Sequence, residues 1–178
     1  MVAQVQAMQW KCVTTLRKYR ADIAEYIARH GKAEGERLFE VENTPIEVRR
    51  IEGNLLLREG VKAIFDLLVG AAETAYSNAN ARIGVGDSST AAADTQTGLL
   101  GGNTAFKAMD ATYPIVGALA DKKVTFRASF GASEGNFAWE EWTVDNGSSA
   151  NKNLNRKVEA LGTKSGGTWQ LSCDVSLA

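Results

Sequence analysis

The segment GVGDSST, Gly84 to Thr90, contains the glycines and hydroxyl groups that phosphate-binding loops use. In such loops, successive backbone N–H groups surround the phosphate oxygens. This segment lacks the third glycine of a dinucleotide fingerprint and the Gly-Lys-Ser/Thr of a nucleotide-binding loop. The apolar stretch ARIGV precedes it, and the Ala- and Thr-rich residues that follow show no helical periodicity. We therefore expect a strand that ends in a loop, and not a phosphate site.

Two adjacent acids, Glu140 and Glu141, raise the question of acid–base catalysis. Neighbouring residues of a strand point to opposite faces, so these two cannot form the facing carboxylate pair of a glycosidase. The simpler expectation is that one faces solvent and the other pairs with a basic residue such as Arg127 or Arg156. The segments VRR and NRK are expected to supply cross-strand ion pairs as well, and not a nucleic-acid patch.

Residues for metal binding and nucleophilic catalysis are sparse. His30 is the single histidine and lies in the charged stretch ARHGKAEGER, where we expect it to be exposed. Cys12 and Cys173 lie near opposite ends without a Cys/His cluster, so zinc sites and histidine-based triads lack their parts. Asp87, Ser88 and Ser89 have no base nearby. The sequence therefore predicts neither catalytic, cofactor-binding nor metal-binding residues, and a protein that is not an enzyme.

The two cysteines are interpreted as free thiols, as is usual in a reducing cytoplasm. A bridge between them stays open if the first and last strands meet. The start MVAQVQAMQW has no basic segment followed by an apolar one, and no span of about 20 apolar residues is present. We therefore expect assembly in a cytoplasm and no membrane partner.

The overall composition is that of a folded globular protein. The 178 residues are 44% hydrophobic and 23% charged, which suits one domain with a sizeable core. Twenty basic residues stand against 21 acidic ones, for a net charge of -1. Nonspecific binding to nucleic acid needs an excess of positive charge, so nucleic acid is not an expected partner.

Most of the chain has the period of β-strands. AMQWKCVTTLRKY, KVTFRASF and TWQLSCDVSLA alternate, ERLFEVE and PIEVRRIE are also interpreted as strands, and NFAWEEWTVD carries large apolar groups on both faces, as a central strand would. ADIAEYIARHG fits a short helix or an insertion within a hairpin. The helical spacing of apolar residues predicts one packed helix at about 54–69.

These elements predict a mainly β fold, an antiparallel β-sandwich or jelly-roll-like domain with one packed helix. We expect an N-terminal extension, residues 1–50, with a strand, a short helix and a hairpin. A β-rich core domain, residues 51–178, would follow. The predicted core residues, from the helix and the strands, are Val61, Ile64, Phe65, Leu68, Phe126, Phe130, Phe137, Trp139, Trp169 and Leu171.

The long connection at 86–103 is the segment that a simple sandwich does not require. Loops longer than about 15 residues are uncommon in compact domains unless they are functional or bound to something. Its many small residues suit close backbone contact with a neighbour. We interpret it as a contact loop or arm against another subunit, with partner-contact candidates Ser88, Ser89, Thr90, Thr95, Thr97, Leu99, Leu100 and Asn103.

Several strings of the chain resemble one group of proteins. They are EGNLLLREGV, AYSNANARIGVGDSSTAA, TQTGL, FKAMDATYP, VTFRASFGASEGNFAWEEWTVDNGSS and a C-terminal string from NLNRKV to TWQLSCDVSL. Over residues 51–178 the chain is similar to small virion structural proteins of tailed bacteriophages, whereas the first 50 residues match only loosely. The resemblance implies a structural protein of the virion and brings no catalytic motif.

Two placements within the virion follow from this resemblance. A head decoration or cement protein would bind the major capsid protein in many copies, with trimers favoured, and would stabilise the shell. A tail, baseplate or fibre-adaptor protein would bind another virion subunit in few copies. The small, nearly neutral chain has no coiled-coil or repeat segment, which favours decoration. From a different class, a carbohydrate-binding adsorption module would stack sugars on Trp139, Trp142 or Trp169.

Overall fold

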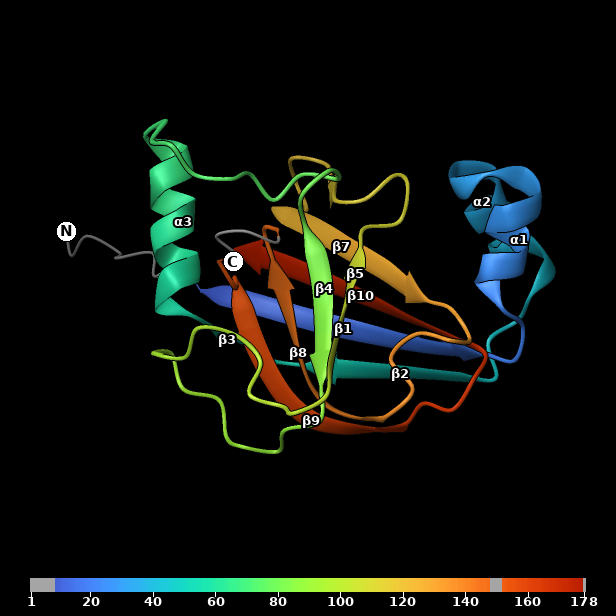
Figure 1. Ribbon diagram of the computed structural model, residues 1–178. Helices are drawn as coiled ribbons and strands as arrows, with labels where there is room; N and C mark the ends of the chain where they lie inside the picture. The colour runs from blue at the N-terminus through green and yellow to red at the C-terminus, as the bar shows by residue number, and fades with distance from the viewer. Residues whose placement is uncertain (1–8, 148–151, 178) are drawn as a thin grey trace.

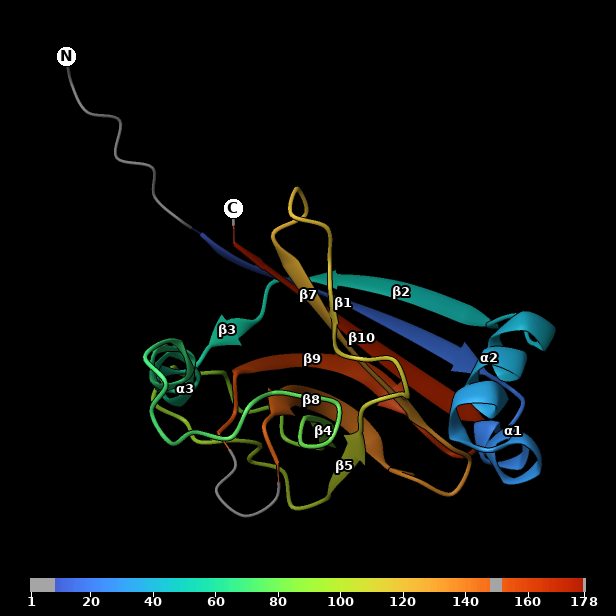
Figure 2. The same ribbon diagram turned by 90° about the horizontal axis from the view of Figure 1, so that it is seen from above.

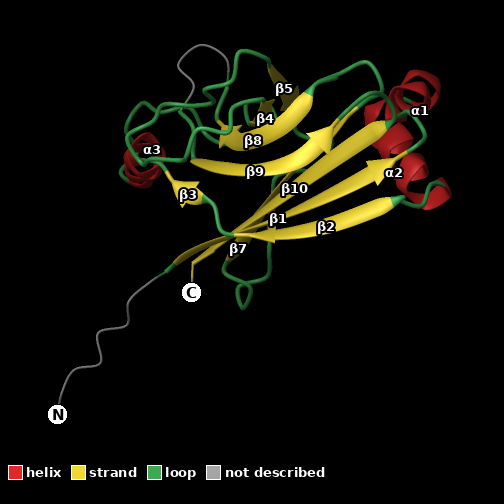
Figure 3. Cartoon of the chain, turned by 90° about the horizontal axis from the view of Figure 1, so that it is seen from below, coloured by secondary structure: helices red, strands yellow, loops and turns green. Residues whose placement is uncertain are grey.

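The computed structural model describes residues 9–147 and 152–177, which form two antiparallel five-stranded sheets packed face to face. Figure 2 shows the sheets as two separate layers, and Figure 3 shows the same layers from below. The helices stand at the ends of this sandwich, α3 at one end and α1 with α2 at the other (Figure 1). The antiparallel β-sandwich predicted from the sequence is confirmed.

The first sheet joins the two ends of the chain. Its order is β2 (Glu47–Glu52), β1 (Trp10–Tyr19), β10 (Thr168–Leu177), β7 (Lys123–Phe130) and β6 (Ile115–Val116). β1 and β10 pair over their whole length, from Trp10 opposite Leu177 to Tyr19 opposite Thr168. Strand pairing over such a separation in sequence places β1 inside the sandwich, so the expected boundary at residue 50 falls within β2. Residues 1–8 of the expected extension lie outside the described residues.

The second sheet has β8 as its central strand. Its order is β3 (Leu55–Leu56), β9 (Asn155–Thr163), β8 (Ala138–Asp145), β4 (Arg82–Gly86) and β5 (Thr104–Ala108). The pairing of β8 with β9 shifts between Trp139 and Glu141. Because this irregularity interrupts the strict alternation of faces, Trp139 and Trp142 are both completely buried although they lie three positions apart, a spacing that would put them on opposite faces of a regular strand. The expectation of a central strand at this position is confirmed.

The core lies between the sheets and is centred on aromatic rings. Trp139 packs edge-on against Phe130 and Trp169, with ring centroids 4.9 Å apart in both pairs. Among the predicted core residues, the buried ones are Phe126, Phe130, Trp139, Trp169 and Leu171, and Phe137 is partly buried against the same cluster. Trp139, Trp142 and Trp169, the residues that the alternative carbohydrate-binding hypothesis would use, are buried, so they offer no exposed platform for a sugar ring.

Two helices, α1 (Ile23–His30) and α2 (Lys32–Glu42), are inserted between β1 and β2. Asp22 caps α1 by accepting a hydrogen bond from the Ala24 N–H, at 3.0 Å. The prediction of a strand at ERLFEVE is wrong, because this segment belongs to α2. A strand would bury Phe39 and Val41 on one face, whereas the helix buries Phe39 and leaves Val41 72% exposed. The prediction that His30 is exposed is confirmed.

The helix expected at 54–69 is present as α3 (Arg58–Leu68), and Leu55–Leu56 form β3 before it. α3 packs on the sandwich through Gly60 and Ala63, which are buried. The prediction that its apolar stripe lies in the core is wrong: Val61 is only partly buried, and three further residues are exposed, namely Ile64, Phe65 and Leu68. The small residues fit closest to the second sheet, so the large ones point away from it.

Both cysteines are buried free thiols, as expected. The first and last strands do meet, but the register sets Cys12 opposite Val175 and Cys173 opposite Thr14. Burial raises the pKa of Cys12 to about 12 and also raises the pKa of Cys173 well above its usual value. Both side chains therefore stay protonated and unreactive at neutral pH.

Candidate functional site

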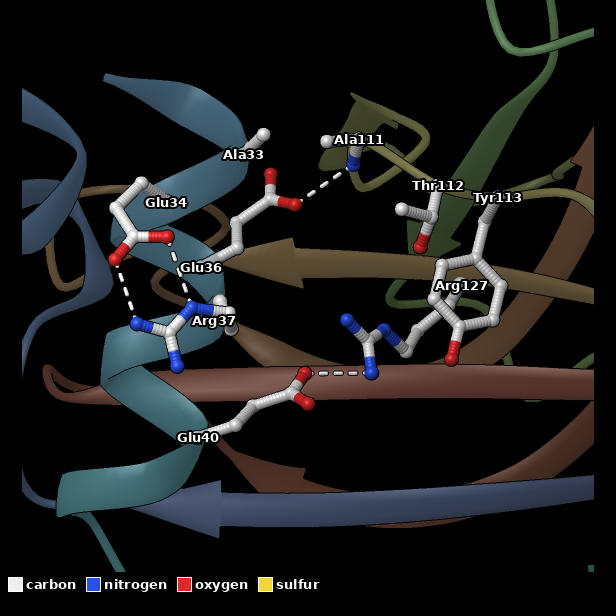
Figure 4. A pocket seen from close by; sticks show the side chains of 9 residues that line it. All are labelled: Ala33, Glu34, Glu36, Arg37, Glu40, Ala111, Thr112, Tyr113 and Arg127. Carbon is white, nitrogen blue, oxygen red and sulfur yellow. Dashed lines mark hydrogen bonds and ion pairs between the residues drawn. The ribbon is translucent and has the colours of Figure 1, made fainter. Parts of the chain in front are cut away.

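A cleft of about 440 Å³ lies between α2 and the turn that follows β5. One wall is the side of α2 that carries Glu34, Glu36 and Glu40, and the other contains Tyr113 and Arg127 (Figure 4). A second hollow of about 270 Å³ adjoins it through Glu36, and Lys32, Lys107 and Asp110 are among its lining residues. The site is therefore built from charged groups of both signs.

Most charges in this cleft are already paired within the chain. Asp110, itself buried, accepts hydrogen bonds from Arg127 Nε at 2.7 Å and from Ser129 Oγ at 2.9 Å. Arg127 also pairs with Glu40, and its guanidinium lies 4.2 Å from the ring centre of Tyr113. These contacts attach α2 to β7, so this part of the cleft is chiefly structural.

Glu36 differs from its neighbours because it forms no ion pair among the described residues. It is only 5% exposed, and its Oε2 accepts a hydrogen bond from the Ala111 N–H at 2.7 Å. Burial raises the pKa of this carboxyl, and the nearby charge of Asp110 raises the pKa further. The Ala111 hydrogen bond and the positive charges of Lys32 and Arg127 oppose these effects without cancelling them. Such a carboxyl can retain a proton or accept a hydrogen bond from a cationic group that enters the cleft.

This cleft was not predicted from the sequence, although one signal was present. Arg127 and Ser129 stand on the polar face of a strand whose other face is strongly apolar. An arginine and a serine on the same face of a mid-chain strand indicate that another polar part of the chain packs on that face. Because ERLFEVE was interpreted as a strand, the helix that covers this face was not predicted.

A second site lies under the long loop between β4 and β5 (yellow-green in Figure 1). Glu141 on β8 and Arg156 on β9 are both completely buried and form an ion pair, with Nε 2.6 Å from Oε2. The pairing of one of the two adjacent glutamates with Arg156 is thus confirmed. This ion pair is here called the loop anchor.

The loop anchor fixes the loop from inside. Glu141 Oε1 accepts hydrogen bonds from the N–H groups of Leu100, at 2.9 Å, and Gly101, at 2.7 Å. The two terminal nitrogens of Arg156 donate to Gln96 Oε1 and to the carbonyl of Thr90. Opposite charges and backbone dipoles thus neutralise both buried ions, and they attach three separate parts of the loop to the second sheet.

The glycines of GVGDSST have a structural explanation. Gly84 and Gly86 lie in β4, and a Cβ on Gly84 would meet the Phe106 ring at 2.4 Å. A Cβ on Gly86 would meet Glu141 Oε1 at 2.6 Å. These residues are glycine because neighbouring side chains cross over them. Asp87 accepts hydrogen bonds from the side chain and backbone of Asn103, which lower its pKa and close the base of the loop.

The predicted partner-contact residues are all on this loop, but they do not share one environment. Ser88 and Leu99 are partly covered by the chain itself. The exposed members of the set are Ser89, Thr90, Thr95, Thr97, Leu100 and Asn103. The described contacts that position the loop come from its own chain.

Within the described residues, no group of three or more His, Cys, Asp or Glu side chains could hold a metal ion. None of the described helices is both long and apolar enough to span a membrane. No protein-family model matches the chain, and searches of curated proteins and of solved structures found no match either. The resemblance to phage virion proteins therefore stays a prediction from the sequence.

Proposed function

We propose that this chain is a non-enzymatic structural protein of a bacteriophage virion, and specifically a capsid decoration or cement protein. In this proposal it binds the outer head lattice through the exposed side of the loop at 86–103. The virion is then its location, and the major capsid protein is its partner. The class of protein comes from the resemblance over residues 51–178, and the choice of surface comes from the loop.

The observation that carries the choice of surface is the loop anchor. Glu141 and Arg156 bind the inner side of the loop at Thr90, Gln96 and Leu100. The outer side displays mostly small residues, together with Asp94, whose charge is paired with Arg58, and Leu100, which is 48% exposed. A contact loop that is ordered before binding loses little conformational entropy when the partner arrives, so more of the contact energy contributes to affinity.

The copy number of the protein in purified virions tests its placement. Quantitative mass spectrometry against the major capsid protein should find hundreds of copies if the protein decorates the head. A few to a few dozen copies would place it in the tail, baseplate or neck and would contradict the decoration proposal.

A loop variant tests the surface. Because Leu100 is exposed, Leu100→Asp should leave the fold intact while it weakens binding to capsids at least about tenfold. Val41→Asp on α2 is the matched control, because Val41 is also an exposed apolar residue, is 72% exposed and lies outside the loop. Unchanged binding of Leu100→Asp, or equal losses in both variants, would rule out the loop as the contact surface.

A further inference from the structure

The outward side of α3 is an apolar surface that no described part of the chain covers. Ile64 is 38% exposed, Phe65 58%, Leu68 77% and Val69, which follows the helix, 78%. We call these four residues the α3 face. The helix stands at one end of the sandwich, away from α1 and α2, and nothing in the described chain lies beyond it in Figures 1 and 2. Contiguous exposed apolar residues of this kind mark interaction surfaces.

Charged residues flank the α3 face on one edge, and the order of their charges along the helix bears on which partner the face can bind. Lys62 and Asp66 lie one turn apart and form an ion pair, with side-chain exposures of 71% and 24%. Ile64 lies midway between them in sequence. The last turn of α3 contains no basic residue, so positive charge is confined to the first part of the helix.

We propose that the α3 face binds the α3 face of a second copy of this chain, with the two helices antiparallel. A two-fold axis near Ile64 and Phe65 sets Lys62 of each copy opposite Asp66 of the other. The apolar residues of the two helices then meet along the axis. The charged edges lie on the same side of the pair, because a two-fold axis perpendicular to both helices brings matching edges together.

The antiparallel arrangement is favoured by charge in two ways. A parallel pair, whose two-fold axis runs along the helices, would place the two charged edges on opposite sides, so Lys62 and Asp66 would meet no charged partner in the other copy. An antiparallel pair also sets the positive N-terminal end of each helix dipole beside the negative C-terminal end of the other. Because such a contact closes on itself, it produces a dimer, and not the trimer expected above for a decoration protein.

The size of the surface sets the expected strength. An α-helix of 11 residues is about 16 Å long, so this face buries less than the roughly 800 Å² per partner of a standard interface. We therefore expect reversible dimers whose population rises with protein concentration. The dimer uses a surface separate from the loop at 86–103, so it stands or fails independently of the proposed function.

Sedimentation equilibrium of the full chain over a range of concentrations tests the proposal. The wild-type protein should show a monomer–dimer equilibrium, and Phe65→Asp should raise the dissociation constant at least about tenfold. Leu119→Asp is the control, since Leu119 is 96% exposed and far from α3 in sequence. Both variants remove an exposed apolar side chain and add one negative charge, at two different places on the surface.

A charge exchange tests the antiparallel register itself. Lys62→Glu and Asp66→Lys should each weaken self-association, because each creates like charges across the axis. Mixing the two variants should restore dimers, because the glutamate introduced in the first variant then faces the lysine introduced in the second. The unchanged Asp66 of the first variant likewise faces the unchanged Lys62 of the second. Neither variant can restore its own internal ion pair in the mixture, so recovery reports contact between copies.

Three outcomes of the association measurements would overturn the proposal. They are a wild-type chain that stays monomeric at all concentrations, a trimer in place of a dimer, and a mixture of the two charge variants that remains as weak as each variant alone. If Phe65→Asp lowered the melting temperature strongly without changing the mass, the α3 face would be covered within the chain and the proposal would again be wrong.

Discussion

The loop anchor and the cleft beside α2 each bury one glutamate side chain, and the two glutamates are treated differently. Glu141 meets Arg156 and two backbone N–H groups, so its charge is neutralised on all sides. Glu36 meets one backbone N–H group and lies near Asp110, a charge of the same sign. A buried carboxylate stabilises a fold only when its partners replace the water that it loses. The Glu141 carboxylate therefore stabilises the fold, whereas the charged form of Glu36 destabilises it.

The largest expected effect follows from removing the partner of the fully neutralised glutamate. Arg156→Met leaves the Glu141 charge buried without a counter-ion, and we expect the free energy of unfolding to fall by about 3 to 5 kcal/mol. Urea denaturation measures the loss, and hydrogen exchange of residues 88–103 should rise with it. The double variant Glu141→Gln, Arg156→Met should recover much of the stability, because no buried charge remains. A loss below about 1 kcal/mol in the single variant would show that the pair is hydrated.

A smaller loss is expected in the cleft. Asp110→Ala removes the acceptor that Arg127 and Ser129 share, and leaves a largely covered guanidinium with Glu40 as its remaining charged partner. We expect a loss of about 2 kcal/mol in urea denaturation. Asp110→Asn, which retains a carbonyl oxygen, should lose less. Equal losses in the two variants would mean that the negative charge, which both variants lack, is what Asp110 contributes.

Substitution of Glu36 should increase the free energy of unfolding, whereas the two substitutions above decrease it. The pKa of Glu36 is raised in the folded protein, so the folded state holds this proton more tightly than the unfolded state. The stability linked to this proton is complete below the ordinary pKa of 4.5 and is lost as the pH rises toward the folded value. Glu36→Gln keeps an acceptor for the Ala111 N–H without the charge, so it should be more stable than wild type at pH 7.

Thermal unfolding between pH 4 and pH 7 measures this effect, and Glu34→Gln is the control on the same helix. Glu34 is exposed, and its hydrogen bonds to Arg37 lower its pKa, so removing its charge should slightly destabilise the protein at pH 7. If both substitutions shift the melting temperature in the same direction, the contrast between buried and exposed glutamates on α2 is incorrect.

The smallest effect is expected at the edge of the loop. Asp94 pairs with Arg58 at 3.0 Å, but both side chains are largely exposed. Asp94→Ala should change the free energy of unfolding by no more than about 0.5 kcal/mol, because water screens the pair. A loss comparable to that of Arg156→Met would show that the loop depends on its exposed ion pair as much as on the buried one.

Local patterns in the sequence determined the strands and much of the core. Alternation identified β1, β7 and β10, because a strand with one buried face must repeat every second residue. It also predicted the burial of Phe126, Phe130 and Leu171 on those strands. Charge and the alternation of strand faces also predicted that one of the two adjacent glutamates pairs with a basic residue such as Arg156. These features depend on neighbours within a few residues, or on a rule that holds in every sheet.

The tertiary structure alone decided what the remaining surfaces do. Helical periodicity identified α3 but not which side of it meets the sandwich, and Gly60 and Ala63 took that place because small side chains allow the closest approach. α2 was mistaken for a strand because its only completely buried large apolar residue, Phe39, is paired in sequence with an exposed Val41. The cleft and the attachment of the loop to Glu141 and Arg156 join residues distant in sequence, and the α3 face is exposed because no other described part of the chain covers it. Periodicity carries no information about such contacts.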